Sequence, residues 1–91
     1  MNKQLIEQWT FLLLSGEIKQ IKGQFLDPRR PGTACALGVL NYLEQLTGMG
    51  PYWATELEVT PEFLQEVQDR NENGHSFEEI AEFIGETFGL I

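Results

Sequence analysis

Two reactive side chains occur once each in this 91-residue chain: the thiol of Cys35 and the imidazole of His75. A cysteine nucleophile needs a base within hydrogen-bond reach, so these two residues form the candidate catalytic pair. Thr33 is the expected N-cap of a helix, and Cys35 then falls in the first turn, where backbone amides and the helix dipole favour the thiolate. A free cysteine also packs well as a small core residue. The core role needs fewer assumptions, so we predict no catalytic residue and treat Cys35 as a core or ligand-contacting residue.

Metal and disulfide chemistry are not indicated by the sequence. A single cysteine cannot form an internal disulfide, which is typical of a reducing cytoplasm. One cysteine and one histidine are too few for a structural zinc site, which usually has four such ligands. Carboxylates are frequent from Glu56 onward, but no spacing among them singles out an acid–base pair or a calcium loop. We expect neither a metal nor another cofactor.

Anion binding is the chemistry that the first half of the chain favours. Lys19, Gln20, Arg29 and Arg30 all precede the expected helix start at Thr33. Exposed amides at a helix N-terminus, with arginine forks nearby, suit a phosphate or a carboxylate. The chain has no glycine-rich phosphate loop of the usual pattern. A solvated basic loop is therefore the alternative interpretation.

The net charge of −8 is unevenly distributed along the chain. Residues 1–43 carry five basic and three acidic side chains, whereas residues 44–91 carry one basic and eleven acidic ones. This balance disfavours direct binding to duplex nucleic acid. The acidic half is either a solvated face or a surface that docks onto a basic partner.

These residues must be positioned by helices. The composition, with 42% hydrophobic and 22% charged residues, is that of a globular chain, and 91 residues suffice for one modest core. Apolar residues at helical spacing and cap signals predict four helices, and the signals are Asn2 before the first, Thr33 before the second, Thr60-Pro61 before the third and Ser76 with Glu79 before the fourth. We predict a mainly α, compact single domain over residues 1–91, with irregular loops.

The second helix is expected to run from Thr33 to the stop signal at Gly48 and to lie at the centre of the fold, because it is apolar around much of its circumference. Gly38 inside it suggests the close approach of another helix or a ligand. Residues 17–26 are expected to form a turn or a minor extended segment, and residues 49–53 a loop. The longest apolar run, residues 11–14, is too short to span a membrane or to form a signal-peptide core.

An ordered set of short segments carries a family resemblance. The chain reads Ser-Gly-Glu-Ile-Lys-Gln over residues 15–20, Cys-Ala-Leu-Gly-Val-Leu over residues 35–40, and Asn-Glu-Asn-Gly-His-Ser-Phe over residues 71–77, followed by Ile80-Ala81. It resembles a set of small uncharacterised phage-encoded proteins that carry similar segments in the same order. In that family the second segment contains two cysteines, of which one is Ala36 here, and a tyrosine replaces Ile18.

The resemblance implies a phage or prophage accessory protein in a bacterial cytoplasm, and such a protein without enzyme motifs is expected to block host defence. The first route is sequestration of a small nucleotide-derived immune signal, with the shared polar residues Asn71 and Ser76 joining the basic residues and Cys35 as ligand contacts. The second route is an acidic inhibitor that binds a basic defence protein. A small cysteine-dependent enzyme is the third interpretation. A homo-oligomer is left open.

Overall fold

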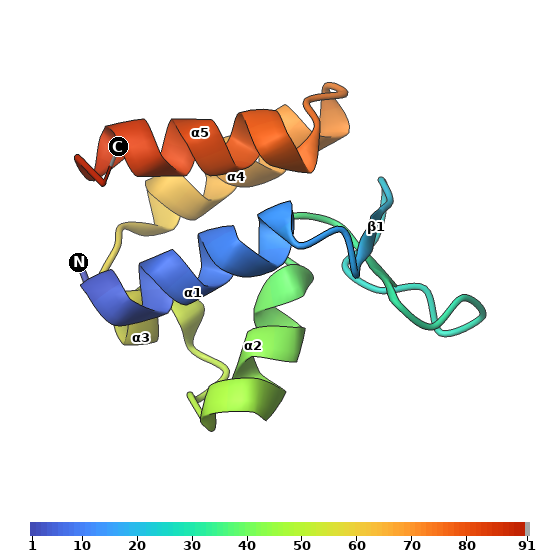
Figure 1. Ribbon diagram of the computed structural model, residues 1–91, viewed down its shortest axis with the longest axis horizontal. Helices are drawn as coiled ribbons and strands as arrows, with labels where there is room; N and C mark the ends of the chain where they lie inside the picture. Colours follow the sequence, from blue (N-terminus) through green and yellow to red (C-terminus); the bar gives the residue numbers. More distant parts are fainter. Residues whose placement is uncertain (91) are drawn as a thin grey trace.

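The structure, a computed structural model, describes residues 1–90 and is mainly helical, with 54% of the chain in helices. Two very short strands complete it, and both lie between the first two helices in the sequence (Figure 1). The elements in chain order are α1 (Lys3–Leu14), β1 (Lys19–Gln20), β2 (Thr33–Ala34), α2 (Val39–Thr47), α3 (Trp53–Leu57), α4 (Pro61–Glu72) and α5 (Phe77–Thr87).

Strands β1 and β2 pair in parallel, with Lys19 opposite Thr33 and Gln20 opposite Ala34. An antiparallel bridge joins Leu26 to Ala34, so Ala34 is paired on both sides. The extended segment expected within residues 17–26 is therefore confirmed. We call residues 15–38 the projecting segment, since the loop between the strands extends away from the helices in Figure 1, and residues 1–14 and 39–90 the helical body.

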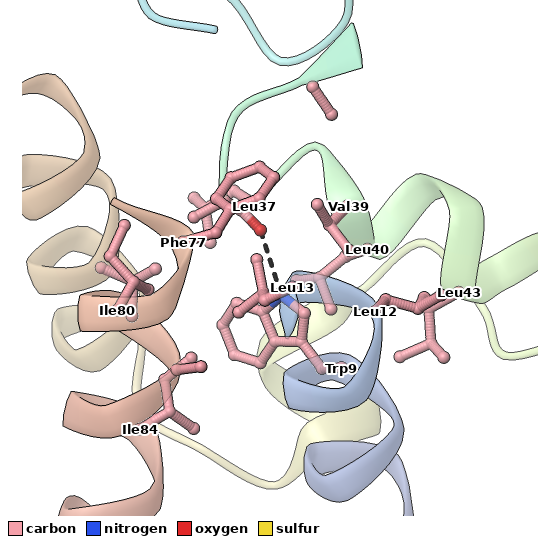
Figure 2. Packing of buried hydrophobic residues seen from close by; sticks show 14 of the residues in the cluster. Trp9, Leu12, Leu13, Leu37, Val39, Leu40, Leu43, Phe77, Ile80 and Ile84 are labelled. Carbon is pink, nitrogen blue, oxygen red and sulfur yellow. Dashed lines mark hydrogen bonds between the residues drawn. The ribbon is translucent and has the colours of Figure 1, made fainter. Parts of the chain in front are cut away.

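The core is built around α1, which contacts α2, α3 and α5. Trp9 is fully buried, and its indole Nε1 donates a hydrogen bond of 3.0 Å to the carbonyl of Ala36. Leu40 from α2 and Ile84 from α5 pack around it (Figure 2). Helix α2 buries Val39, Leu40 and Leu43, but its last turn is exposed, and the central position expected for it belongs to α1.

The cap signals identify three of the five helix starts and the end of α2. The side chain of Asn2 accepts from the backbone of Leu5, and the side chain of Thr60 accepts from Phe63 with Pro61 at the first helical position. Ser76 and Glu79 form the predicted capping box. Gly48 ends α2 in the left-handed conformation, with φ of 75°. These predictions are confirmed because each depends on contacts within one turn.

The predicted start of the second helix is wrong. Thr33 does not cap a helix but pairs with Lys19 in the small sheet, and α2 begins at Val39. The hydroxyl of Thr33 donates 2.7 Å to the carbonyl of Arg30 instead of accepting from a helical amide. Strand pairing with a distant segment has overridden a local helix signal.

Gly38 shows the close approach that its sequence position predicts, but no helix makes it. Gly38 precedes α2, and a Cβ atom there would overlap the backbone carbonyl of Phe25. The approach belongs to the loop after β1, whose Phe25 carbonyl also accepts from the amide of Cys35 at 3.0 Å. Only glycine fits where the projecting segment returns to the helical body.

The structure contains a fifth helix that the sequence pattern did not predict. The one-turn helix α3 follows the expected loop, and the carbonyl of Leu57 accepts from the amide of Asn2 at 2.8 Å. Leu57 is fully buried, so α3 closes the core beside the start of α1. Within residues 1–90, no helix combines the length and the apolar character that crossing a membrane requires.

Candidate functional site

A hollow of about 430 Å³ is lined by residues of both strands of the small sheet. Lys19 from β1 and Arg30 from the loop before β2 both line it, and we call it the basic hollow. A volume of this size is in the range of small-molecule sites, which is about 300–1,000 Å³. The lining is formed by Glu17, Lys19, Gln20, Ile21, Arg30, Pro31, Gly32 and Thr33.

The parallel ladder brings the two cationic side chains together. The amide of Lys19 donates to the carbonyl of Gly32 at 2.9 Å, and the amide of Ile21 donates to Ala34 at 3.0 Å. The amide of Gly32 in turn donates to the hydroxyl of Tyr42 on α2 at 3.2 Å, which ties the rim to the helical body. Residues eleven apart in the sequence thereby share one hollow.

The charge of Arg30 is partly balanced by a neighbour. Its Nε donates to a carboxylate oxygen of Asp27 at 3.0 Å, and the amide of Arg29 donates to the other oxygen at 2.9 Å. These contacts, first the Arg29 backbone and then the Arg30 side chain, hold the pKa of the Asp27 carboxyl below its ordinary value. Lys19 forms no ion pair within the described residues. The hollow therefore has one free ammonium and one arginine shared with Asp27, and Glu17 opposes both.

Gln20 and Asn71 belong to an interior hydrogen-bond network. Gln20 donates to the Asn71 side chain at 2.8 Å and to the carbonyl of His75 at 2.7 Å, and it accepts from Phe77 at 3.0 Å. Asn71 is fully buried. It also accepts from Ala36 and donates to Ile21 and Glu72, which uses all four of its hydrogen-bonding sites. The Asn71 amide therefore joins β1, the turn before α2 and helix α4.

Cys35 is fully buried and does not line the basic hollow. Burial raises the pKa of its thiol, although the Gly38 and Leu37 amides act in the opposite direction. The expected thiolate stabilisation in the first turn of a helix is thus wrong, because that helix begins later. The sulfur lies 3.3 Å from the amide of Gly38 and 3.6 Å from the side-chain oxygen of Gln68. No hydrogen bond joins Cys35 to His75 among residues 1–90.

The remaining predicted ligand residues are also separated from the hollow. Ser76 caps α5, with its hydroxyl accepting from Glu79 at 3.1 Å. Arg29 is exposed on the loop but does not line the hollow. Of the seven candidate ligand residues, the structure brings together Lys19, Gln20 and Arg30. Within residues 1–90, no group of three or more histidine, cysteine or acidic residues could hold a metal ion.

A second and larger hollow on the surface was not predicted from the sequence. It is a hollow of about 710 Å³ between α1 and α5, which we call the α1–α5 groove. Its apolar side chains include Phe11 and Leu14, which are 72% and 58% exposed. The signal that could have revealed it is that both residues lie off the buried stripe of α1. The groove is lined by Lys3, Glu7, Thr10, Phe11, Leu14, Glu78, Ala81, Glu82, Gly85 and Leu90.

Comparisons of the chain with protein-family models, with curated proteins and with solved structures find no significant match.

Proposed function

We propose that the protein is a non-catalytic binding protein that captures a small phosphate-bearing ligand at the basic hollow. The observation that carries this proposal is that Lys19 and Arg30 line one hollow of about 430 Å³. A charge-assisted hydrogen bond contributes about 1.5–3 kcal/mol. Two such contacts, opposed by Glu17 and Asp27, imply weaker binding than the full set of seven predicted residues would give.

The proposed biological setting is sequestration of a nucleotide-derived immune signal in a bacterial host. The resemblance to small phage-encoded proteins supports this setting, and the buried thiol of Cys35, with its raised pKa, favours binding over cysteine catalysis. A sequestering protein holds its ligand without changing it. The ligand should therefore be recoverable intact after the protein is denatured.

Calorimetry with a defined ligand panel tests the proposal. The panel consists of inorganic pyrophosphate, ATP, a cyclic dinucleotide and ADP-ribose, and each bound ligand is released by heat and analysed by chromatography. Lys19→Ala and Arg30→Ala should each weaken binding about tenfold, since one charge-assisted contact is lost. Lys22→Ala is the matched control, because Lys22 is in the same segment but outside the lining. The proposal is wrong if no ligand of the panel gives a heat of binding. It is also wrong if Lys22→Ala weakens binding as much as Lys19→Ala and Arg30→Ala do.

A second candidate function, inhibition of a basic protein, is favoured by the charge of the helical body. That body contains twelve acidic and two basic residues, a net of −10. Only two of its carboxylates, Glu7 and Glu66, form ion pairs with described residues. Unpaired surface carboxylates accelerate encounter with a cationic partner.

Phage growth in a defence-bearing host distinguishes the two candidates. Loss of protection in a variant that reverses the exposed residues Glu78 and Glu82 to lysine, with protection kept in Lys19→Ala/Arg30→Ala, favours the protein partner. The reverse pattern favours the small anion. Lys22→Ala, in the projecting segment but outside the lining of the hollow, serves as the control for the second variant.

A further inference from the structure

We propose that the α1–α5 groove is the docking site for a cationic amphipathic helix of another protein. This inference is independent of the basic hollow, and it names the surface and the partner chemistry for the second candidate function. The groove and the hollow share no lining residue. Each can therefore be altered without touching the other.

The groove follows two helices along their length. Helices α1 and α5 lie side by side and run in opposite directions, as Figure 1 shows. On α1 the lining residues Lys3, Glu7, Phe11 and Leu14 are spaced by three or four positions, so they form one stripe. The stripe spans eleven residue steps, or about 16 Å at the helical rise of 1.5 Å per residue. A helix of about three turns matches this length.

The floor of the groove is apolar and uses small residues where α5 contributes. Ala81 and Gly85 are buried there, and their lack of bulk leaves room above them. Phe11 and Leu14 stand exposed along the opposite wall. An apolar patch with this elongated shape is typical of helix-in-groove recognition, in which a partner helix inserts its apolar face.

The charged residues at the rim of the groove favour a cationic partner. Glu7 on one wall and Glu78 and Glu82 on the other are all exposed, and Lys3 is the single cation of the lining. Lys3 lies 3.7 Å from Glu7, which leaves the two carboxylates of α5 without a cationic neighbour in the groove. A partner helix with lysine or arginine beside its apolar face would complement this arrangement.

A second copy of this chain is a poor occupant of the groove. Each copy has a net charge of −8, and two helical bodies brought face to face would each contribute −10. Like charges juxtaposed across an interface oppose association. The charge balance therefore favours a basic partner over self-association.

Fluorescence anisotropy with designed peptides tests the inference on the intact protein. The probe is a fluorescein-labelled helical peptide of about four turns, with leucines on one face and lysines beside them. One comparison peptide has glutamates in place of the lysines, and another has the same composition scrambled so that the leucines no longer share a face. The first peptide should bind, with a Kd that rises with salt, and the other two should bind at least about tenfold more weakly.

Matched variants locate the binding site. Leu14→Ala and Glu82→Lys should each raise the Kd about tenfold. Leu46→Ala and Glu86→Lys are the controls, since Leu46 is 70% exposed on α2 and Glu86 is exposed on α5, both outside the groove. All four positions are exposed, so the variants should fold, and circular dichroism checks this.

The outcomes separate this inference from the second candidate function. Equal binding of the scrambled basic peptide, or equal effects of Leu46→Ala and Leu14→Ala, overturns the groove while leaving a general acidic surface in place. A dimer in light scattering that Leu14→Ala dissociates assigns the groove to a second copy and also overturns the inference. If no cationic peptide binds, both the groove inference and the second candidate function are wrong.

Discussion

The projecting segment and the helical body differ in charge and in what holds them. The segment has four basic and two acidic residues, whereas the body has two basic and twelve acidic ones. Apolar packing around Trp9 holds the body together. Residues 19–32 of the segment are mostly exposed. The Asn71 side chain donates a hydrogen bond to the Ile21 carbonyl, and the Tyr42 hydroxyl accepts one from the Gly32 amide, so that both attach the segment to the helices.

This contrast shows how one small chain can carry two separate recognition surfaces. Packing cannot hold an exposed basic loop in place, so buried polar groups of the body do so instead. Asn71 is the clearest example, because it contacts the segment on both sides of its exposed loop, at Ile21 and at Ala36. The anion site proposed at the hollow therefore depends on residues that do not line it.

The largest loss of stability is expected at Gly38, where the projecting segment rejoins the helical body. Gly38→Ala would drive a methyl group into the Phe25 carbonyl, and the backbone there cannot move without breaking the Cys35–Phe25 hydrogen bond. We expect a loss of about 3 kcal/mol or more in the free energy of unfolding, measured by urea denaturation. Gly50→Ala is the control, since it meets only the flexible Glu56 side chain. Equal stability of Gly38→Ala and wild type would contradict this geometry.

The second largest loss of stability is expected for Asn71→Ala, and it should affect the projecting segment more than the helical body. Asn71→Ala removes the partners of the Ala36 amide and the Ile21 carbonyl, and we expect a loss of about 2–3 kcal/mol. Hydrogen exchange should show that the Lys19 and Ile21 amides lose protection before those of α1 and α5. Asn73→Ala, at an exposed position two residues later, should have little effect. Uniform loss of protection would show that the segment and the body unfold as one unit.

The sequence predicted features that depend on near neighbours in the chain. The capping residues Asn2, Thr60 and Ser76 were identified because each accepts a hydrogen bond from an amide three residues later. Thr33 resembles them locally, with an apolar run after it. Its partner, however, is Lys19, fourteen positions away, and no local pattern distinguishes a strand residue of this kind from a cap.

The candidate site was predicted only in part for the same reason. Lys19 and Arg30 come together through strand pairing, which the sequence indicated only as a minor extended segment. The Asn and Gly that follow Asn71 are typical of a turn, yet α4 continues through Glu72 and the Asn71 side chain is fully buried. The groove needs two helices that are distant in the sequence, so neither helix alone could reveal it.

The third prediction concerns Cys35, at the junction of the two regions. Cys35→Ser places a hydroxyl in a fully buried position, and we expect a loss of about 1–2 kcal/mol. Ligand binding at the hollow should persist in this variant. In wild type, burial and the raised thiol pKa should make labelling by a disulfide reagent at pH 8 much slower than in urea-unfolded protein. Rapid labelling of the native protein would contradict the packing described for this residue.

The fourth prediction is confined to the helical body. Ser76→Ala removes the hydroxyl that accepts from Glu79 at the start of α5, and the expected loss is about 1 kcal/mol. The projecting segment is joined to this region through the side chain of Gln20, which does not bond to Ser76. The amides of the segment should therefore keep their protection from hydrogen exchange. If Ser76→Ala also weakens peptide binding under conditions in which the variant is fully folded, the first turn of α5 contributes to the docking surface.

The smallest effect is a pH dependence at the same cap. Hydrogen bonds from the Ser76 backbone and then from its side chain hold the pKa of the Glu79 carboxyl below its ordinary value of 4.5. The stabilisation is therefore complete above the unfolded pKa and is lost as the pH falls through the folded one. Glu79→Gln cannot ionise, so its deficit in the free energy of unfolding relative to wild type should shrink as the pH drops below 4.5. Urea denaturation from pH 7 to pH 3 measures this difference, and a deficit that stays constant over that range would rule out ionisation of Glu79 as its cause.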